Sequence, residues 1–180
     1  MEMTQKGYNM KTSSTYMTII VSVLLSLGTF VQAASQSDQS KATDLVLITQ
    51  SEAAELRLTD EDLLTPIGTP PLSTDGPLIL LRRPEVIKKG KTALINTGSP
   101  TDLMILFEPN QAPINMQSLK VQARKSFFKK SLTKRLQPYI RGTSIIAHNV
   151  ELPSGNFLIE IEIADQVGDT TFQRYRIKVQ

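Results

Sequence analysis

His148 is the residue best suited to act as a general base or a metal ligand at neutral pH, and the sequence contains one histidine and no cysteine. A base needs a nucleophile and an orienting acid, and Ser144 and Ser154 are the serines closest to it in sequence. Neither serine lies in a nucleophile-elbow pattern, and a lone histidine cannot supply zinc's usual ligand set. We therefore expect a solvent-facing loop histidine, and no catalytic, cofactor-binding or metal-binding residue.

Two acidic pairs near the end of the chain invite a chemical interpretation. Glu160 and Glu162 should share one strand face, about 6 to 7 Å apart by strand rise. Paired carboxylates can hydrolyse glycosides, but the chain has no tryptophan to form a sugar platform. Asp165 and Asp169 could offer oxygen ligands to calcium, although two acids fall short of a dedicated loop. A solvated strand face and a hairpin turn explain the four residues better.

The strongest chemical signal is the acid-free segment KSFFKKSLTKRL, residues 125–136. Its basic residues could contact phosphates or other acidic groups, and its adjacent phenylalanines could stack on bases or enter a partner's pocket. The candidate interaction surface consists of Lys125, Phe127, Phe128, Lys129, Lys130, Lys134 and Arg135. The structural alternative is an ordinary domain edge or short amphipathic helix, with the phenylalanines packed and the lysines in water.

Charge is unevenly distributed along the sequence. Residues 34–76 contain eight acids and two basic residues, a net charge of 2 − 8 = −6, whereas residues 109–150 contain eight basic residues and no acid. An acidic N-terminal arm could therefore lie against the basic middle of the same molecule.

The elements that would position these residues are mostly short extended runs separated by turns. The turns are marked by glycine, proline and asparagine, for example at residues 96–100 and 152–155. The predicted strands include residues 78–81, 92–95, 102–107, 118–123 and 144–147.

The last two strands show the clearest pattern. Residues 157–163 place Phe157 and three isoleucines on one face and the two glutamates on the other. After a turn at residues 165–169, the next strand alternates two faces: Phe172, Arg174, Arg176 and Lys178 on one, and Gln173, Tyr175, Ile177 and Val179 on the other. The acids and bases of this antiparallel hairpin could pair across the strands, each pair contributing roughly 0.2 to 1 kcal/mol.

The acidic arm has its own elements. Residues 45–48 form an apolar run suited to a buried strand, and Thr49 with Glu52 form a capping-box pattern that opens a short helix. Residues 60–64 suggest another helical turn, with acids at its start. Four prolines between residues 66 and 77 exclude any regular element there, so we place the domain boundary after residue 77.

The segment LPSGNFLIEIEIADQVGD resembles the closing hairpin of bacterial immunoglobulin-like domains, with its D-x-x-G turn at residues 165–168. SPTDLMILFEPNQAPINMQSLKV resembles the first half of such domains, in which S-P-x-D opens a strand. The resemblance covers about residues 78 to 179 and implies an immunoglobulin-like antiparallel β-sandwich over residues 78–180. The segment KSFFKKSLTKRLQPYI departs from it, being longer and more basic than the usual connection. The mature chain also resembles small exported proteins of Gram-negative bacteria with no assigned activity.

The first 33 residues have the features of a secretory signal peptide. Lys6 and Lys11 give a positive start, residues 18–30 are apolar, and a V-Q-A motif places cleavage after Ala33. Met10 would serve equally as the start. The apolar run is shorter than the roughly 20 residues that span a bilayer, so we expect a periplasmic or secreted protein without a transmembrane segment. With no cysteine, its core must hold without disulfides.

The expected protein has three parts: a signal peptide at residues 1–33, an acidic arm with a short helix and proline-rich linker at 34–77, and the sandwich at 78–180. Its expected role is that of a non-catalytic accessory or protein-interaction module of the cell envelope, with another envelope protein as partner. One alternative is binding of an anionic envelope polymer or lipid headgroups through the basic segment 120–141. Export disfavours nucleic acid, and a hydrolase with an unrecognised site is the third alternative.

Overall fold

The computed structural model describes residues 44–64, 75–89 and 92–180. The expected signal peptide at residues 1–33, its cleavage site after Ala33 and the greater part of the proline-rich linker lie outside the described residues. Within the described residues, no helix is both long and apolar enough to cross a membrane.

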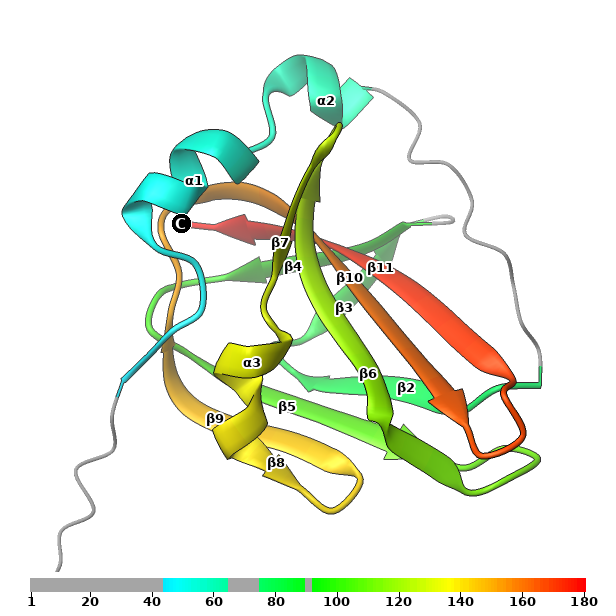
Figure 1. Ribbon diagram of the computed structural model, residues 1–180. Helices are drawn as coiled ribbons and strands as arrows, with labels where there is room; N and C mark the ends of the chain where they lie inside the picture. The colour runs from blue at the N-terminus through cyan, green and yellow to red at the C-terminus, as the bar shows by residue number, and fades with distance from the viewer. Residues whose placement is uncertain (1–43, 65–74, 90–91) are drawn as a thin grey trace, which may run out of the picture. The chain divides into compact units, whose positions relative to one another are not determined.

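The described chain is mainly β-structure, and its two sheets form a sandwich-like arrangement (Figure 1). In the five-stranded sheet the order is β1-β9-β5-β2, and β8 pairs with β9. Its strands are β1 (Leu45–Val46), β2 (Leu78–Arg83), β5 (Thr101–Glu108), β8 (Ile140–Arg141) and β9 (Ser144–Glu151). The strands predicted at residues 78–81, 102–107 and 144–147 lie within β2, β5 and β9, which confirms them.

The six-stranded sheet has the order β3-β4-β11-β10-β6-β7. Its strands are β3 (Val86–Lys89), β4 (Thr92–Thr97), β6 (Ile114–Lys125), β7 (Phe128–Ser131), β10 (Gly155–Asp165) and β11 (Thr170–Val179). Two strand pairs depart from a purely antiparallel sandwich, because β1 runs parallel to β9 and β4 runs parallel to β11. Each parallel pair joins strands far apart in sequence, as parallel pairing requires a long connection.

The hairpin of β10 and β11 confirms the alternation predicted from the sequence. Its strands pair antiparallel, from Gly155 opposite Val179 to Ala164 opposite Thr170. Phe157 and the three isoleucines that alternate after it are all buried in the core. Alternation therefore identified the core-facing side of the central strand correctly.

The arm contributes to the same core. Thr49 caps helix α1 (Gln50–Leu56), and the predicted capping box is present, because Glu52 N–H donates to Thr49 Oγ1 and Thr49 N–H donates to Glu52 Oε2. Ala53 and Leu56 of α1 are buried in the core cluster, and α1 contacts β6 and β7. A shorter helix, α2 (Asp60–Leu64), follows.

The buried strand expected over residues 45–48 is shorter than predicted. β1 covers Leu45–Val46, and Val46 is exposed. Leu47 and Ile48 are buried outside the strand, where Leu47 N–H donates to the Glu151 carbonyl at 3.0 Å. The chain must leave the sheet here because Thr49 already begins the helix cap.

The basic segment forms a hairpin followed by a short helix. β6 and β7 pair antiparallel across a tight turn in which Ser126 has a positive φ of 46°. Helix α3 (Thr133–Leu136) and a 3₁₀ turn, η1 (Gln137–Tyr139), then carry the chain from the six-stranded sheet to the five-stranded one. The alternative of a short amphipathic helix is thus wrong for Phe128, which lies in a strand.

Gly155, at the start of β10, takes a backbone conformation that L side chains rarely adopt. Its φ is +134°, and a Cβ there would lie 2.6 Å from Arg57 Nε. Gly155→Ala should therefore lower the free energy of unfolding by about 1 to 3 kcal/mol in urea denaturation. Gly98→Ala is the control, because no atom beyond Gly98 and its two chain neighbours lies within 4 Å of the Cβ position. Equal stability of the two variants would contradict this account of Gly155.

Candidate functional site

The predicted interaction surface is spread over three elements. Lys125 ends β6, Phe127 lies in the turn, Phe128, Lys129 and Lys130 lie in β7, and Lys134 and Arg135 lie in α3. These residues therefore share one edge of the six-stranded sheet and the helix that follows it.

The two phenylalanines are the most unusual feature of this edge. Phe127 is 97% exposed and Phe128 is 60% exposed. The structural alternative, in which both phenylalanines pack, is therefore wrong. The reason is that Phe127 occupies the turn itself and Phe128 begins an edge strand whose four residues are all exposed. Leu132 and Leu136 of the same segment supply the buried apolar groups instead.

Arg135 does not face solvent as a free cation. Its Nη1 donates to Glu52 Oε2 and its Nη2 to Glu52 Oε1, both at 2.7 Å, and Nη1 also donates to the Leu47 carbonyl at 2.7 Å. Lys130 Nζ lies 2.9 Å from Glu52 Oε1. The prediction that the acidic arm lies against the basic middle is confirmed at this contact.

This cluster shifts the ionisation of both partners. The hydrogen bonds from Arg135 hold the pKa of Glu52 far below its usual range, with further lowering by Thr49 and Lys130. The same hydrogen bonds from Glu52 raise the pKa of Arg135. The pair is therefore fully ionised at neutral pH.

A second contact joins the arm to the end of β6. Lys125 Nζ lies 3.6 Å from Asp62 Oδ2, and the same oxygen accepts hydrogen bonds from the Thr59 backbone and hydroxyl at 2.8 Å. These bonds, led by the one from the Thr59 backbone, lower the pKa of Asp62. Asp62 lies in α2, so the ion pair places α2 beside the turn between β6 and β7. Leu64, at the end of α2, is 84% exposed.

We call Leu64, Phe127 and Phe128 the tip patch. In Figure 1, α2 lies next to the end of the hairpin formed by β6 and β7. Of the basic residues predicted here, Lys125, Lys130 and Arg135 pair with acids of the arm. Lys129 and Lys134 are exposed and have no ion-pair partner among the described residues. The surface is thus an exposed aromatic tip, and most of the basic side chains beside it have their charges compensated by acids of the arm.

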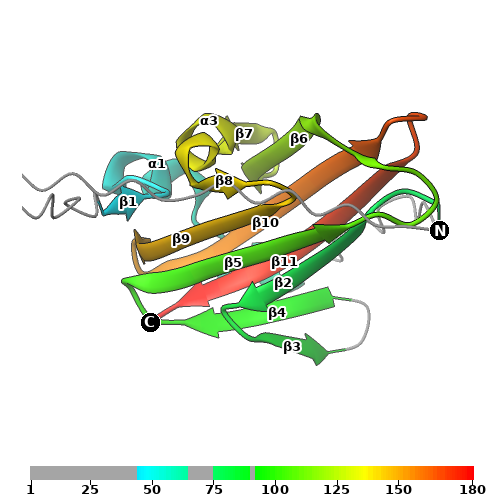
Figure 2. The ribbon, with the colours of Figure 1, turned by 90° about the horizontal axis from the view of Figure 1, so that it is seen from below.

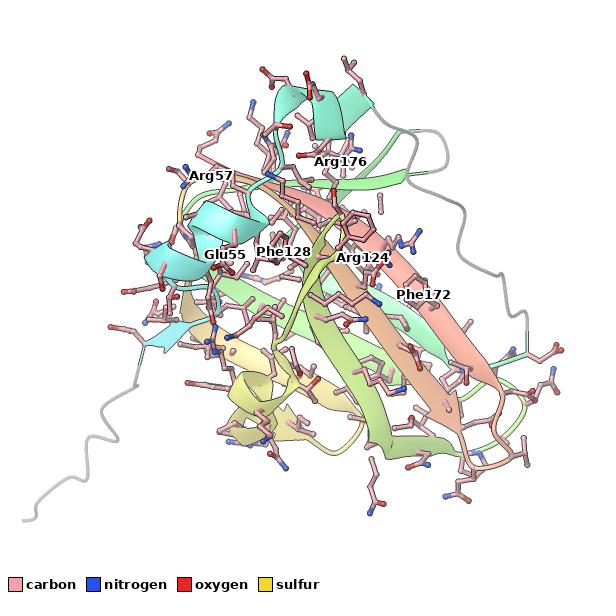
Figure 3. All side chains as sticks on the ribbon, turned by 45° about the horizontal axis from the view of Figure 1, so that its top comes forward. Glu55, Arg57, Arg124, Phe128, Phe172 and Arg176 are labelled. Atoms are coloured by element: carbon pink, nitrogen blue, oxygen red, sulfur yellow. The ribbon has the colours of Figure 1, made fainter. Side chains whose placement is uncertain are left out.

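Beside the tip, the buried Glu160 accepts hydrogen bonds from three side chains on the face of the six-stranded sheet that points away from the core. Figure 3 shows Phe128 with Glu55 and Arg57 of the arm on one side and Arg124 and Phe172 on the other. Glu160 Oε1 accepts from Arg174 Nε at 2.8 Å and from Arg124 Nη1 at 3.4 Å. Gln122 Nε2 donates to the other oxygen of Glu160 at 3.3 Å.

Glu160 corrects the expectation of a solvated acidic face. Its side chain is 2% exposed, whereas that of Glu162 is 31% exposed and pairs with Lys120 at 2.9 Å. Glu160 stands on the central strand β10, where long side chains of both neighbouring strands cover it. The expected cross-strand pairing is confirmed for Glu160 and Arg174, which stand directly opposite each other.

His148 lies in strand β9 and not in a loop, although it is exposed as predicted. Its Nδ1 is 3.1 Å from Asp102 Oδ1, and Asp102 also pairs with Arg83 at 3.4 Å. Ser144 begins the same strand and donates its hydroxyl hydrogen bond to the Arg141 carbonyl at 2.7 Å, so it is not directed at His148. The described residues therefore bring an acid to His148, but they do not direct Ser144 at it.

Asp165 forms the predicted hairpin turn. Its Oδ1 accepts from the backbone N–H groups of Val167, Gly168 and Asp169 at 2.9 to 3.0 Å. Among the residues that the structure describes, no group of three or more histidine, cysteine or acidic side chains could hold a metal ion.

Leu64 was not predicted to belong to this surface, and Glu52 was not predicted to be the acid that pairs with Lys130 and Arg135. The opposite charges of the arm and the basic segment indicated the contact, but only the fold shows which acids make it. The chain matches no protein-family model, no curated protein and no solved structure.

Proposed function

We propose that this protein is an exported, non-catalytic interaction module of the cell envelope, built on an immunoglobulin-like sandwich, and that it binds a protein partner through the tip patch. The observation that carries the proposal is the exposure of Phe127 and Phe128 at the end of a hairpin. Export is inferred from residues 1–33, and the immunoglobulin-like assignment is inferred from the resemblance over residues 78–179.

Energetics support the tip as a binding element. Burying an exposed phenylalanine contributes about 1.5 to 3 kcal/mol, and aromatic anchors dominate many protein interfaces. The tip is held in place at its base by the Lys125–Asp62 and Lys130–Glu52 ion pairs, so less ordering is required on binding. A partner with an apolar pocket would gain most of its affinity from these two side chains.

The ion pairs favour a protein partner over an anionic polymer. Five of the eight basic residues in the segment 120–141 already pair with acids: Lys120 and Arg124 with β10, and Lys125, Lys130 and Arg135 with the arm. The remaining three, Lys129, Lys134 and Arg141, would give a weak and strongly salt-dependent attraction. A hydrolase remains the third alternative, and it would need a nucleophile placed beside His148.

Capture of partners from the envelope fraction of the source cells tests the proposal. The baits are the chain from Ala34, a Phe127→Ser/Phe128→Ser variant and a Lys129→Ala/Lys134→Ala variant, each at low and moderate salt. We expect a protein that the wild type and the lysine variant retain at both salt concentrations. The tip variant should bind it at least about 100-fold more weakly, because it loses the burial of two phenylalanines.

Val167→Ser is the matched control, because Val167 is 73% exposed in the turn between β10 and β11. Its partner binding should equal that of the wild type. The wild type could instead capture lipid or polysaccharide, and this capture could be lost in the lysine variant or with added salt. That result would refute protein recognition through the tip. Equal capture by the tip variant would do the same.

A further inference from the structure

The long edge strands of the two sheets differ in how they are protected against pairing. Exposed edges usually carry lysines or prolines that prevent another strand from joining the sheet. At one end of the six-stranded sheet, the edge strand β7 carries Lys129 and Lys130, both exposed. β2, at one end of the five-stranded sheet, reads LILLRR and has no charge over residues 78–81.

The outer face beside β2 is also apolar. Ile79, Ile105 and Phe107 face the core and are buried, so the residues alternating with them face outward. The outward residues meet across the strands, with Leu80 opposite Leu106 and Met104 opposite Ile146. The outward apolar residues are Leu78, Leu80, Met104, Leu106 and Ile146. In Figure 2, β2 lies beside β5, on the side away from β9.

Charges of opposite sign mark the two ends of this edge. Arg82 and Arg83 are exposed at the end of β2, whereas Glu108 is exposed opposite Leu78 at its beginning. Arg82 has no ion-pair partner among the described residues. When two copies of β2 pair antiparallel, the arginine end of each strand lies beside the end of the other strand that is next to Glu108. The charges at the two ends are therefore complementary.

We propose that β2 pairs antiparallel with β2 of a second copy of this chain about a two-fold axis, joining two five-stranded sheets into one. In this register Leu80 lies opposite Leu80 of the partner copy, and Arg82 of each copy lies next to Leu78 of the other. Leu78 in turn stands opposite Glu108 of its own copy. The outward leucines then form one continuous apolar stripe. Pro77 and Pro84 flank β2 and limit the pairing to its own length, so the dimer is weak and forms at high protein concentration.

This surface is separate from the tip patch. β2 contacts β3, and β3 lies at the opposite end of its sheet from β7. The dimer can therefore form whether or not the tip binds a partner protein, and each proposal can fail independently of the other.

Sedimentation over a range of concentrations tests the dimer with the chain from Ala34. The mass of the wild type should rise toward that of two copies, whereas Leu80→Lys, which gives β2 a lysine like those of the edge strand β7, should remain monomeric. Arg82→Glu should weaken the dimer without touching the apolar stripe. Ile87→Lys, on the edge strand β3, is the matched control and should still dimerise, as should Phe127→Ser/Phe128→Ser.

Disulfide trapping tests the register, because the chain has no cysteine of its own. Directly opposite residues of antiparallel strands lie within the distance that a disulfide spans. Oxidised Leu80→Cys should give a covalent dimer, and Ile87→Cys should give little. A wild type that stays monomeric at the highest soluble concentration would overturn the proposal. So would a dimer that persists in Leu80→Lys or one that disappears in the tip variant.

Discussion

Replacing Arg174 by alanine is expected to lower the free energy of unfolding by about 3 kcal/mol, measured by urea denaturation at neutral pH. Glu160, its partner, is 2% exposed, and Arg174 makes the shortest of its ion-pair contacts at 2.8 Å. Removing the guanidinium leaves a buried carboxylate with incomplete compensation. Arg124 and Gln122 remain as partners, which places the loss at the lower end of the range for broken buried pairs.

Arg83→Ala is the control for this prediction. It removes the Arg83–Asp102 pair, whose side chains are 66% and 39% exposed, and exposed pairs contribute about 0 to 1 kcal/mol. A double-mutant cycle gives the coupling directly, because Arg174→Ala should have a much smaller effect in a Glu160→Gln protein. Equal losses for Arg174→Ala and Arg83→Ala would show that Glu160 does not depend on Arg174.

Glu52→Gln is expected to lower the free energy of unfolding at neutral pH by about 2 to 3 kcal/mol. The substitution keeps the capping-box geometry but removes the charge that binds Arg135 and Lys130. Because the folded-state pKa of Glu52 is depressed, its stabilisation is complete above the ordinary glutamate pKa of about 4.3. It is lost as the pH falls below that value.

Unfolding free energies measured at a series of pH values test this sign. The difference between wild type and Glu52→Gln should be constant near neutral pH and should shrink progressively in acid. Glu55→Gln is the matched control, because Glu55 is exposed on the same helix and has no ion-pair partner among the described residues. Its effect should stay within about 0.5 kcal/mol. A Glu52→Gln difference that grows in acid would contradict the account of the cluster.

Alternation and charge account for the features that the sequence predicts correctly. The core face of β10 follows from Phe157 and the isoleucines that alternate with glutamate, because strand geometry turns successive side chains to opposite faces. The contact of the arm with the basic segment follows from their opposite charges. Both features depend on local pattern or net charge and need no knowledge of neighbouring strands.

The features that the sequence did not predict depend on tertiary neighbours. Glu160 is buried because Arg174, Arg124 and Gln122 come from strands on both sides of it, and that strand order is not visible in the pattern of β10. The turn between β6 and β7 contains neither glycine nor asparagine, although Ser126 takes a positive φ there. The tight hairpin that exposes Phe127 therefore had no turn signal.

Site-specific photo-crosslinking in the source cells would show whether the tip patch binds a protein. A photoreactive residue is placed at Phe127 in one version of the full chain and at Val167 in another, since both positions are exposed turn residues. We expect irradiation to join position 127, but not position 167, to one envelope protein. Crosslinks to lipid, equal crosslinks at both positions, or no protein crosslink at position 127 would contradict an interaction module that binds through the tip patch.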